Sequence, residues 1–132
     1  MGKFKYSMQN ILDIKIKLET QAKNEFSEAN RAYLTEKEKL EALFKKRAAY
    51  EASLKEQLSG SLNISEINIC KNNINLIKSA IRTQLMKVKK AEDMLEVKRA
   101  ALNELMKERK THEKLRDKKF EDFQKEEKDN ES

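Results

Sequence analysis

His112 and Cys70 are the only histidine and the only cysteine of the chain, so they are the first candidates for catalysis or metal binding. A histidine acts as a general base or metal ligand only when a nucleophile or further ligands lie within reach. His112 lies in a continuous charged stretch, next to Glu113, that contains no such set of partners. We therefore expect His112 to be a partly exposed structural residue, with no metal bound to it.

The remaining reactive side chains give no pattern of an active site either. Carboxylates are numerous but evenly spread, and no pair is placed for general acid/base work. Gly2 and Gly60 are the only glycines, so the chain has no glycine-rich phosphate loop. The sequence predicts a protein that is not an enzyme, with no catalytic residues and no cofactor.

An apolar heptad repeat is the strongest pattern in the chain. Its first line recurs every seven residues, and its second line follows three residues later, so both lie on one face of a helix in a left-handed coiled coil. The two lines are Ile67, Ile74, Ile81, Val88, Leu95, Leu102 and Cys70, Ile77, Gln84, Ala91, Lys98, Leu105. Cys70 falls on this face, where we expect a small buried residue; a single cysteine offers no disulfide and fits a reducing compartment.

Composition agrees with long helices. The chain of 132 residues has no proline, and 39% of its residues are charged. A weaker pair of lines, interrupted by Glu36 and Arg47, precedes the strong repeat. Its members are Phe26, Tyr33, Leu40, Leu54 and Ala29, Leu43, Tyr50. We expect an all-α fold of two long antiparallel helices in an intramolecular coiled-coil hairpin, elongated and forming a single domain.

One stretch alone reads as a turn. Gly60 suits the left-handed conformation that ends a helix, and Asn63 with Glu66 fits a capping box that begins the next one. The sequence predicts helix one over about 4–57, a turn over 58–63, helix two over about 64–127 and a frayed tail over 128–132. Antiparallel pairing through this turn places Tyr50 beside Asn73, and Asp13 opposite Arg109 as an ion pair.

Charge is unevenly distributed along the second half. Residues 107–119 carry seven basic and three acidic side chains, whereas residues 120–132 carry two basic and six acidic ones. A mixed excess of this kind favours electrostatic docking to protein over a nucleic-acid site. The sequence has neither a signal peptide nor a membrane span, so we expect a cytoplasmic protein without direct membrane insertion.

Several apolar residues lie outside the repeat, and two helices bury only a narrow stripe. They either widen that stripe or form a partner surface, and the sequence leaves both open. They are Leu12, Leu34, Phe44, Ile69, Leu76, Leu85, Met86, Met94, Val97 and Met106.

The two ends of the chain resemble the flagellar export protein FliJ. The resemblance rests on the opening Phe4-x-Tyr6-x-Met8-Gln9-x-Ile11-Leu12-Asp13-Ile14-Lys15 and the closing Glu108-Arg109-Lys110-x-x-Glu113-Lys114-Leu115-x-x-Lys118-Lys119. It implies a stalk or chaperone-like component of the type III export apparatus, peripheral to the inner membrane at the flagellar base and monomeric when free. The implied partners are the export ATPase hexamer, the cytoplasmic domain of the export gate and export chaperones.

The resemblance also implies contact residues. The end that bears both termini would enter the ATPase ring and promote its assembly, through Phe4, Met8, Ile11, Leu12, Lys110, Lys114, Leu115 and Lys118. Gate contact would involve Leu43, Tyr50, Ile77 and Ala80, although the a and d positions of three of them also suit core packing. The chain departs from the family at three positions of the gate surface, which can be aromatic or histidine in the family and are polar here: Lys46, Asn73 and Gln84.

Three other functions remain open at this point. The first is a stalk protein of a virulence-type secretion system, which neighbouring genes would distinguish. The second is a self-associating coiled-coil scaffold, which the mass in solution would reveal. The third is a nucleic-acid-binding helical protein, whose affinity would fall steeply with salt.

Overall fold

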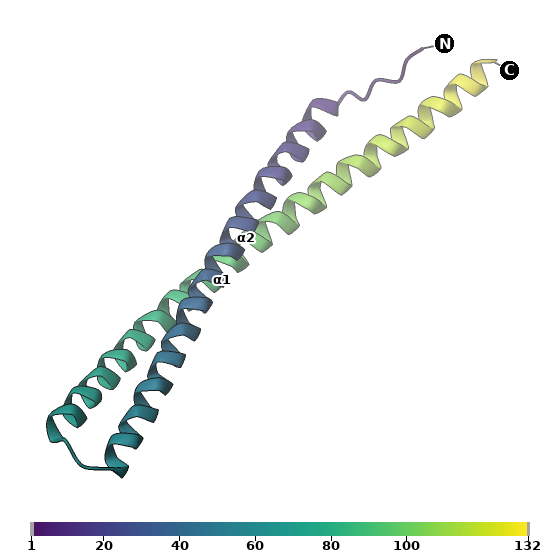
Figure 1. Ribbon diagram of the computed structural model, residues 1–132. Coiled ribbons are helices and arrows are strands. Elements are labelled where there is room, and N and C mark those ends of the chain that lie inside the picture. Colours follow the sequence, from purple (N-terminus) through teal and green to yellow (C-terminus); the bar gives the residue numbers. More distant parts are fainter. Residues whose placement is uncertain (1, 132) are drawn as a thin grey trace. The chain divides into compact units, whose positions relative to one another are not determined.

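The computed structural model describes residues 2–131, and it consists of two long helices. α1 spans Gln9–Ser59 and α2 spans Ile64–Glu131, and the described residues contain no strand. The two helices pack antiparallel and are joined by one short turn (Figure 1). The predicted fold class, an all-α antiparallel hairpin, is confirmed.

The predicted start of helix one is wrong by five residues. Helix α1 begins at Gln9 and not near Phe4, and residues 2–6 have no regular secondary structure. The chain enters the helix through a turn in which the Gln9 amide donates to the Tyr6 carbonyl at 3.0 Å. Residues 2–6 pack on the end of α2 through an aromatic side chain, because the Phe4 ring contacts Phe120 and Phe123.

The predicted end of helix two is also wrong. Helix α2 continues through Glu131, so residues 128–131 are helical and not frayed; residue 132 lies outside the described residues. Half-buried Phe123 and Glu127 occur on these last turns. Packing against residues 2–6 gives the final turns a contact that the sequence pattern does not indicate.

The turn confirms one half of the predicted capping box and corrects another local prediction. The Glu66 amide donates to the Asn63 side-chain oxygen at 3.2 Å, which satisfies a free amide in the first turn of α2. Gly60 does not adopt a left-handed conformation, since neither glycine has a positive φ. A Cβ at Gly60 would meet no atom within 4 Å, so this turn does not require glycine.

Contacts divide the chain into two compact units. The turn unit is Ala29–Leu95, and the terminal unit combines residues 2–28 with residues 96–131. That the whole chain behaves as a single domain stays a prediction.

The turn unit has an apolar core centred on α2. Isoleucines at successive a positions are almost fully buried, and Gln84 is the one buried polar side chain among the described residues of this unit. The buried residues are Ala29, Ile67, Cys70, Ile74, Ile77, Ile81, Gln84 and Leu95. Burial of β-branched side chains along one face is what holds a coiled coil together.

The terminal unit has a thinner core, and α2 contributes no fully buried side chain to it between residues 96 and 131. Leu12 is completely buried, Ala22 is nearly so, and Glu19 lies between them at 3% exposure. Leu12 therefore belongs to the core, although the heptad lines of the sequence do not include it. Its position, one heptad before Glu19 and two before Phe26, extends the inner line of helix one back to the first turn.

Candidate partner-binding surfaces

Cys70 and His112, the first candidates for catalysis or metal binding, both lie on helix α2. Cys70 is buried, and its Sγ donates to the Tyr50 carbonyl at 3.2 Å. His112 is half-buried, and its Nδ1 has no hydrogen-bond partner. Within residues 2–131, no three His, Cys, Asp or Glu side chains are grouped to hold a metal ion. These two residues contribute to helix packing.

Most of the residues predicted to contact an ATPase ring lie at the surface of the terminal unit. Lys110, Lys114 and Lys118 are exposed, and their spacing of four residues places them on one face of α2. Ile11 and Leu115 are 42% and 37% exposed. This exposed set combines ammonium groups with aliphatic surface, which suits a partner that carries carboxylates beside apolar residues.

The other three members of this predicted set are less accessible. Phe4 and Met8 are half-buried, and Leu12 has no exposed surface at all. A partner could reach Leu12 only if the two helices separated. Leu12 thus supports the surface residues from inside, and the ring-contact hypothesis rests on the exposed members.

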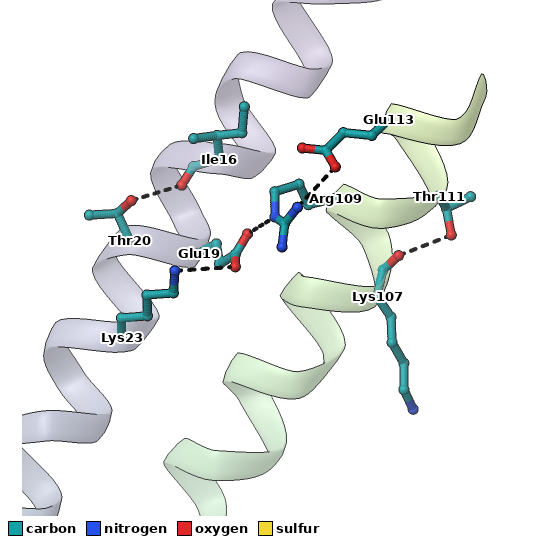
Figure 2. Close-up of polar contacts among 8 residues, drawn as sticks. All are labelled: Ile16, Glu19, Thr20, Lys23, Lys107, Arg109, Thr111 and Glu113. Atoms are coloured by element: carbon teal, nitrogen blue, oxygen red, sulfur yellow. Dashed lines mark hydrogen bonds and ion pairs between the residues drawn. The ribbon is translucent and has the colours of Figure 1, made fainter. Parts of the chain in front are cut away.

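An ion-pair network holds the helices of the terminal unit together, as Figure 2 shows. The Arg109 guanidinium of α2 donates to the Glu19 carboxylate of α1, and also to Glu113 at 3.0 Å. Lys23 lies 3.6 Å from the other oxygen of Glu19. The hydrogen bond from Arg109 keeps the pKa of Glu19 below its ordinary value of 4.5, against the opposing effect of burial. The same bond raises the pKa of Arg109.

The predicted ion pair between Asp13 and Arg109 is wrong. Asp13 is exposed and accepts a hydrogen bond from the Gln9 side chain at 2.9 Å. Leu12 takes the inward position in this turn, so its neighbour Asp13 points outward. Arg109 reaches Glu19 because Glu19 lies on the same inner line, seven residues after Leu12.

Two further ion pairs join the helices of the terminal unit. Lys15 pairs with Glu108 at 2.8 Å, and Lys98 pairs with Glu25 at 3.4 Å. No ion pair of the described residues joins the helices of the turn unit. Helix pairing in the terminal unit therefore combines ion pairs with a thin apolar core, and the sequence pattern shows only that the apolar repeat weakens there.

The predicted gate residues lie between the helices of the turn unit and not on an open face. Ile77 is buried, and Leu43, Tyr50 and Ala80 are half-buried. Tyr50 and Asn73 line one shallow groove of about 190 Å³, in agreement with the pairing that the turn predicts. Packing of the helices accounts for all four positions, so gate contact through them stays a prediction.

The three positions that depart from the family pattern are polar for different reasons. Lys46 is exposed, and Asn73 is half-buried in the groove beside Tyr50. Gln84 is buried, and its amide donates to the Glu36 carbonyl at 2.9 Å and also to the Glu36 carboxylate. Gln84 thus supplies hydrogen bonds to Glu36, the polar residue that interrupts the repeat of helix one.

The apolar residues outside the repeat are mostly exposed. Leu12 is buried and Met106 is half-buried, whereas the other eight remain at the surface. Their exposed fractions are Leu34 47%, Phe44 44%, Ile69 58%, Leu76 70%, Leu85 47%, Met86 73%, Met94 49% and Val97 60%. The structure thus favours surface over a widened core for these eight.

A feature that the sequence reading missed is an apolar groove in the turn unit. Small side chains at Ala29, Ala32 and Ala91 leave a space of about 300 Å³, bordered by Met94 and by the stems of Lys87 and Lys90. The sequence contains the signal, since Ala29 and Ala91 occupy the second heptad line, where larger residues are usual.

Comparison with known proteins identifies the family to which this chain belongs. The family model described as "Flagellar FliJ protein" matches residues 4–132. The chain belongs to the FliJ family. The resemblance carried by the two terminal motifs is therefore confirmed, and this family is part of flagellar and type III protein export.

A solved structure gives the same fold. A YscO-like protein of Chlamydia trachomatis, CT670, is similar over 98% of this chain and 88% of its own, with a TM-score of 0.72 and 21% identity. At this identity the likeness concerns the fold alone. No curated protein matches the chain. No helix among residues 2–131 is long and apolar enough to cross a bilayer.

Proposed function

We propose that this protein is a coupling component of the flagellar type III export apparatus. Its terminal unit binds inside the ring of the export ATPase and favours the assembled hexamer, and its turn unit contacts the export gate. Family membership over residues 4–132 is the observation that carries this proposal. The exposed lysine face of α2, formed by Lys110, Lys114 and Lys118, supplies the charge for an acidic ring interior.

The mechanism is differential binding. A protein that binds the hexamer more tightly than free subunits shifts the equilibrium toward the hexamer by the difference in binding free energy. The chain needs no catalytic group of its own for this effect. Export chaperones are a third proposed partner, for which the exposed methionines Met86 and Met94 offer adaptable surface.

The test is to add the purified chain to the purified export ATPase of the same cell. We expect a larger fraction of hexamer by analytical ultracentrifugation and a higher rate of ATP hydrolysis. Unchanged assembly and hydrolysis, with binding verified in the same samples, would contradict the mechanism. A free chain that sediments as a dimer or larger bundle would favour the scaffold alternative.

A stalk of a virulence-type secretion system remains the second candidate. The fold is compatible with both roles, because the YscO-like protein has the same two-helix fold. Binding to the flagellar ATPase in preference to a virulence-type ATPase would distinguish the two. Deletion of the gene for this chain should abolish swimming and leave effector secretion intact if the role is flagellar.

A further inference from the structure

The segment before α1, Gly2–Tyr6, packs on the last turns of α2. The Phe4 ring makes edge contacts with two aromatic rings, Phe120 at 5.1 Å between centroids and Phe123 at 5.6 Å. The interplanar angles are 89° and 73°, the geometry in which the positive edge of one ring meets the negative face of another. Figure 1 shows this segment in purple beside the yellow-green end of α2.

Charge complements the aromatic contact. Lys3 and Lys5 flank Phe4, and the segment has no acidic residue. Residues 120–132 carry six acidic and two basic side chains. The segment passes close to Glu127, since a Cβ built on Gly2 would lie 3.5 Å from its carboxylate oxygen. A basic, aromatic segment thus lies on an acidic, aromatic helix end.

Aromatic side chains make the ring contacts of this segment with α2. Among the described residues, the one hydrogen bond of this segment's backbone is the local bond from the Gln9 amide to the Tyr6 carbonyl. Lys3 and Lys5 stay exposed, and Phe120 remains 43% exposed although Phe4 touches it. Among the described residues, no backbone hydrogen bond ties the segment to α2.

We propose that the acidic and aromatic end of α2, residues 120–131, is a docking site for a short basic segment with a central aromatic residue. The chain's own Lys3-Phe4-Lys5 occupies this site, and a partner segment of the same chemistry takes it when the cis segment leaves. The inference is independent of the proposed ATPase contact, because binding at this site is measured on the chain alone.

The test uses a fluorescent peptide with the sequence of residues 1–9 as the probe and the full-length chain as the receptor. A tethered cis segment competes at an effective concentration near the millimolar range, so it lowers the apparent affinity for the same segment in trans. We expect the Phe4→Ala chain to bind the peptide about tenfold more tightly than the unaltered chain. Equal binding by the two chains would overturn the proposal.

Three controls define the site. In the Phe4→Ala chain, the added changes Phe120→Ala and Phe123→Ala should abolish binding, whereas Phe44→Ala, an exposed aromatic of the turn unit, should not affect it. A peptide carrying Phe4→Ala should not bind. Because this change is made in the peptide, misfolding of the receptor cannot account for the loss of binding. Retained binding by this peptide, or by the Phe120 and Phe123 variant, would also overturn the proposal.

Discussion

In the turn unit, α2 presents Ile67, Ile74 and Ile81 to α1 with 5–8% of their surface exposed. In the terminal unit, the corresponding positions toward the end of α2 include Arg109 and Arg116, and three ion pairs join the helices. The first unit depends on apolar burial, which salt and acid affect little. The second combines the buried Leu12 and Ala22 with ion pairs, whose contribution falls with salt and with protonation of carboxylates. The same helices are thus stabilised in two ways, so conditions can loosen one unit and spare the other.

The largest expected effect lies in the apolar core of the turn unit. Changing Ile81→Ala removes a nearly buried side chain and leaves a cavity, which should lower the free energy of unfolding by about 3 kcal/mol. Urea unfolding followed by circular dichroism measures the change. The matched change Leu76→Ala, at a residue 70% exposed, should cost less than about 0.5 kcal/mol. Similar costs at the two positions would contradict an apolar core on this face.

The next effect concerns the buried ion pair of the terminal unit. Changing Glu19→Ala leaves Arg109 without its main partner, and we expect a loss of about 2 kcal/mol in the local stability of this unit. Residue-resolved amide hydrogen exchange should show the loss in residues 9–28 and 96–115, with little change in the turn unit. The matched control is Glu28→Ala, an exposed residue of the same helix. Uniform loss of protection along both helices would refute the separation of the two units.

Acid provides a smaller and selective effect. The pKa of Glu19 is lowered by Arg109, so the folded state favours the ionised carboxylate, and its stabilising contribution is present above the ordinary pKa of 4.5. That contribution should be lost as the pH falls below 4.5 through the lowered folded-state pKa. Carboxyl NMR titration should give Glu19 a pKa below its ordinary value of 4.5. A Glu19→Gln chain should lose this part of the pH dependence; an unaltered pH profile would count against the assignment.

The smallest effect is at the turn. Changing Asn63→Ala removes the acceptor for the Glu66 amide at the start of α2 and should cost about 1 kcal/mol. Thermal unfolding should show the loss, and hydrogen exchange should confine it to the first turn of α2. The control Asn68→Ala alters an exposed asparagine beyond that turn. Equal effects would show that the cap contributes nothing specific.

The sequence was sufficient for the fold where one physical signal dominated. The heptad lines of residues 67–105 require an apolar partner face, and the short polar turn brings that face from the preceding helix, so the hairpin follows from periodicity and chain connectivity. The cap at Asn63 was predictable because it depends on two residues three apart. The left-handed Gly60 was not correct, since a glycine permits that conformation without requiring it.

The terminal unit was harder to predict because its contacts are long-range and polar. Arg109 can reach carboxylates over several residues, so pairing through the turn alone chose Asp13 in place of Glu19. The position of residues 2–6 depends on contacts of Phe4 with Phe120 and Phe123, more than a hundred residues away in the chain. Local helix propensity does not indicate such a long-range contact. For the partner surfaces, the sequence supplied candidate residues, and burial then separated Leu12 and Ile77 from the accessible ones.

The central claim is that the exposed lysine face of the terminal unit binds the export ATPase, and one measurement tests it most directly. The rate of ATP hydrolysis by the purified export ATPase is measured with a chain carrying Lys110→Glu, Lys114→Glu and Lys118→Glu. The matched control carries Lys37→Glu, Lys45→Glu and Lys55→Glu, three exposed lysines of the turn unit. We expect the control to stimulate hydrolysis as the unaltered chain does and the terminal-unit variant to lose the stimulation. Full stimulation by the terminal-unit variant, with its helicity unchanged, would contradict the account.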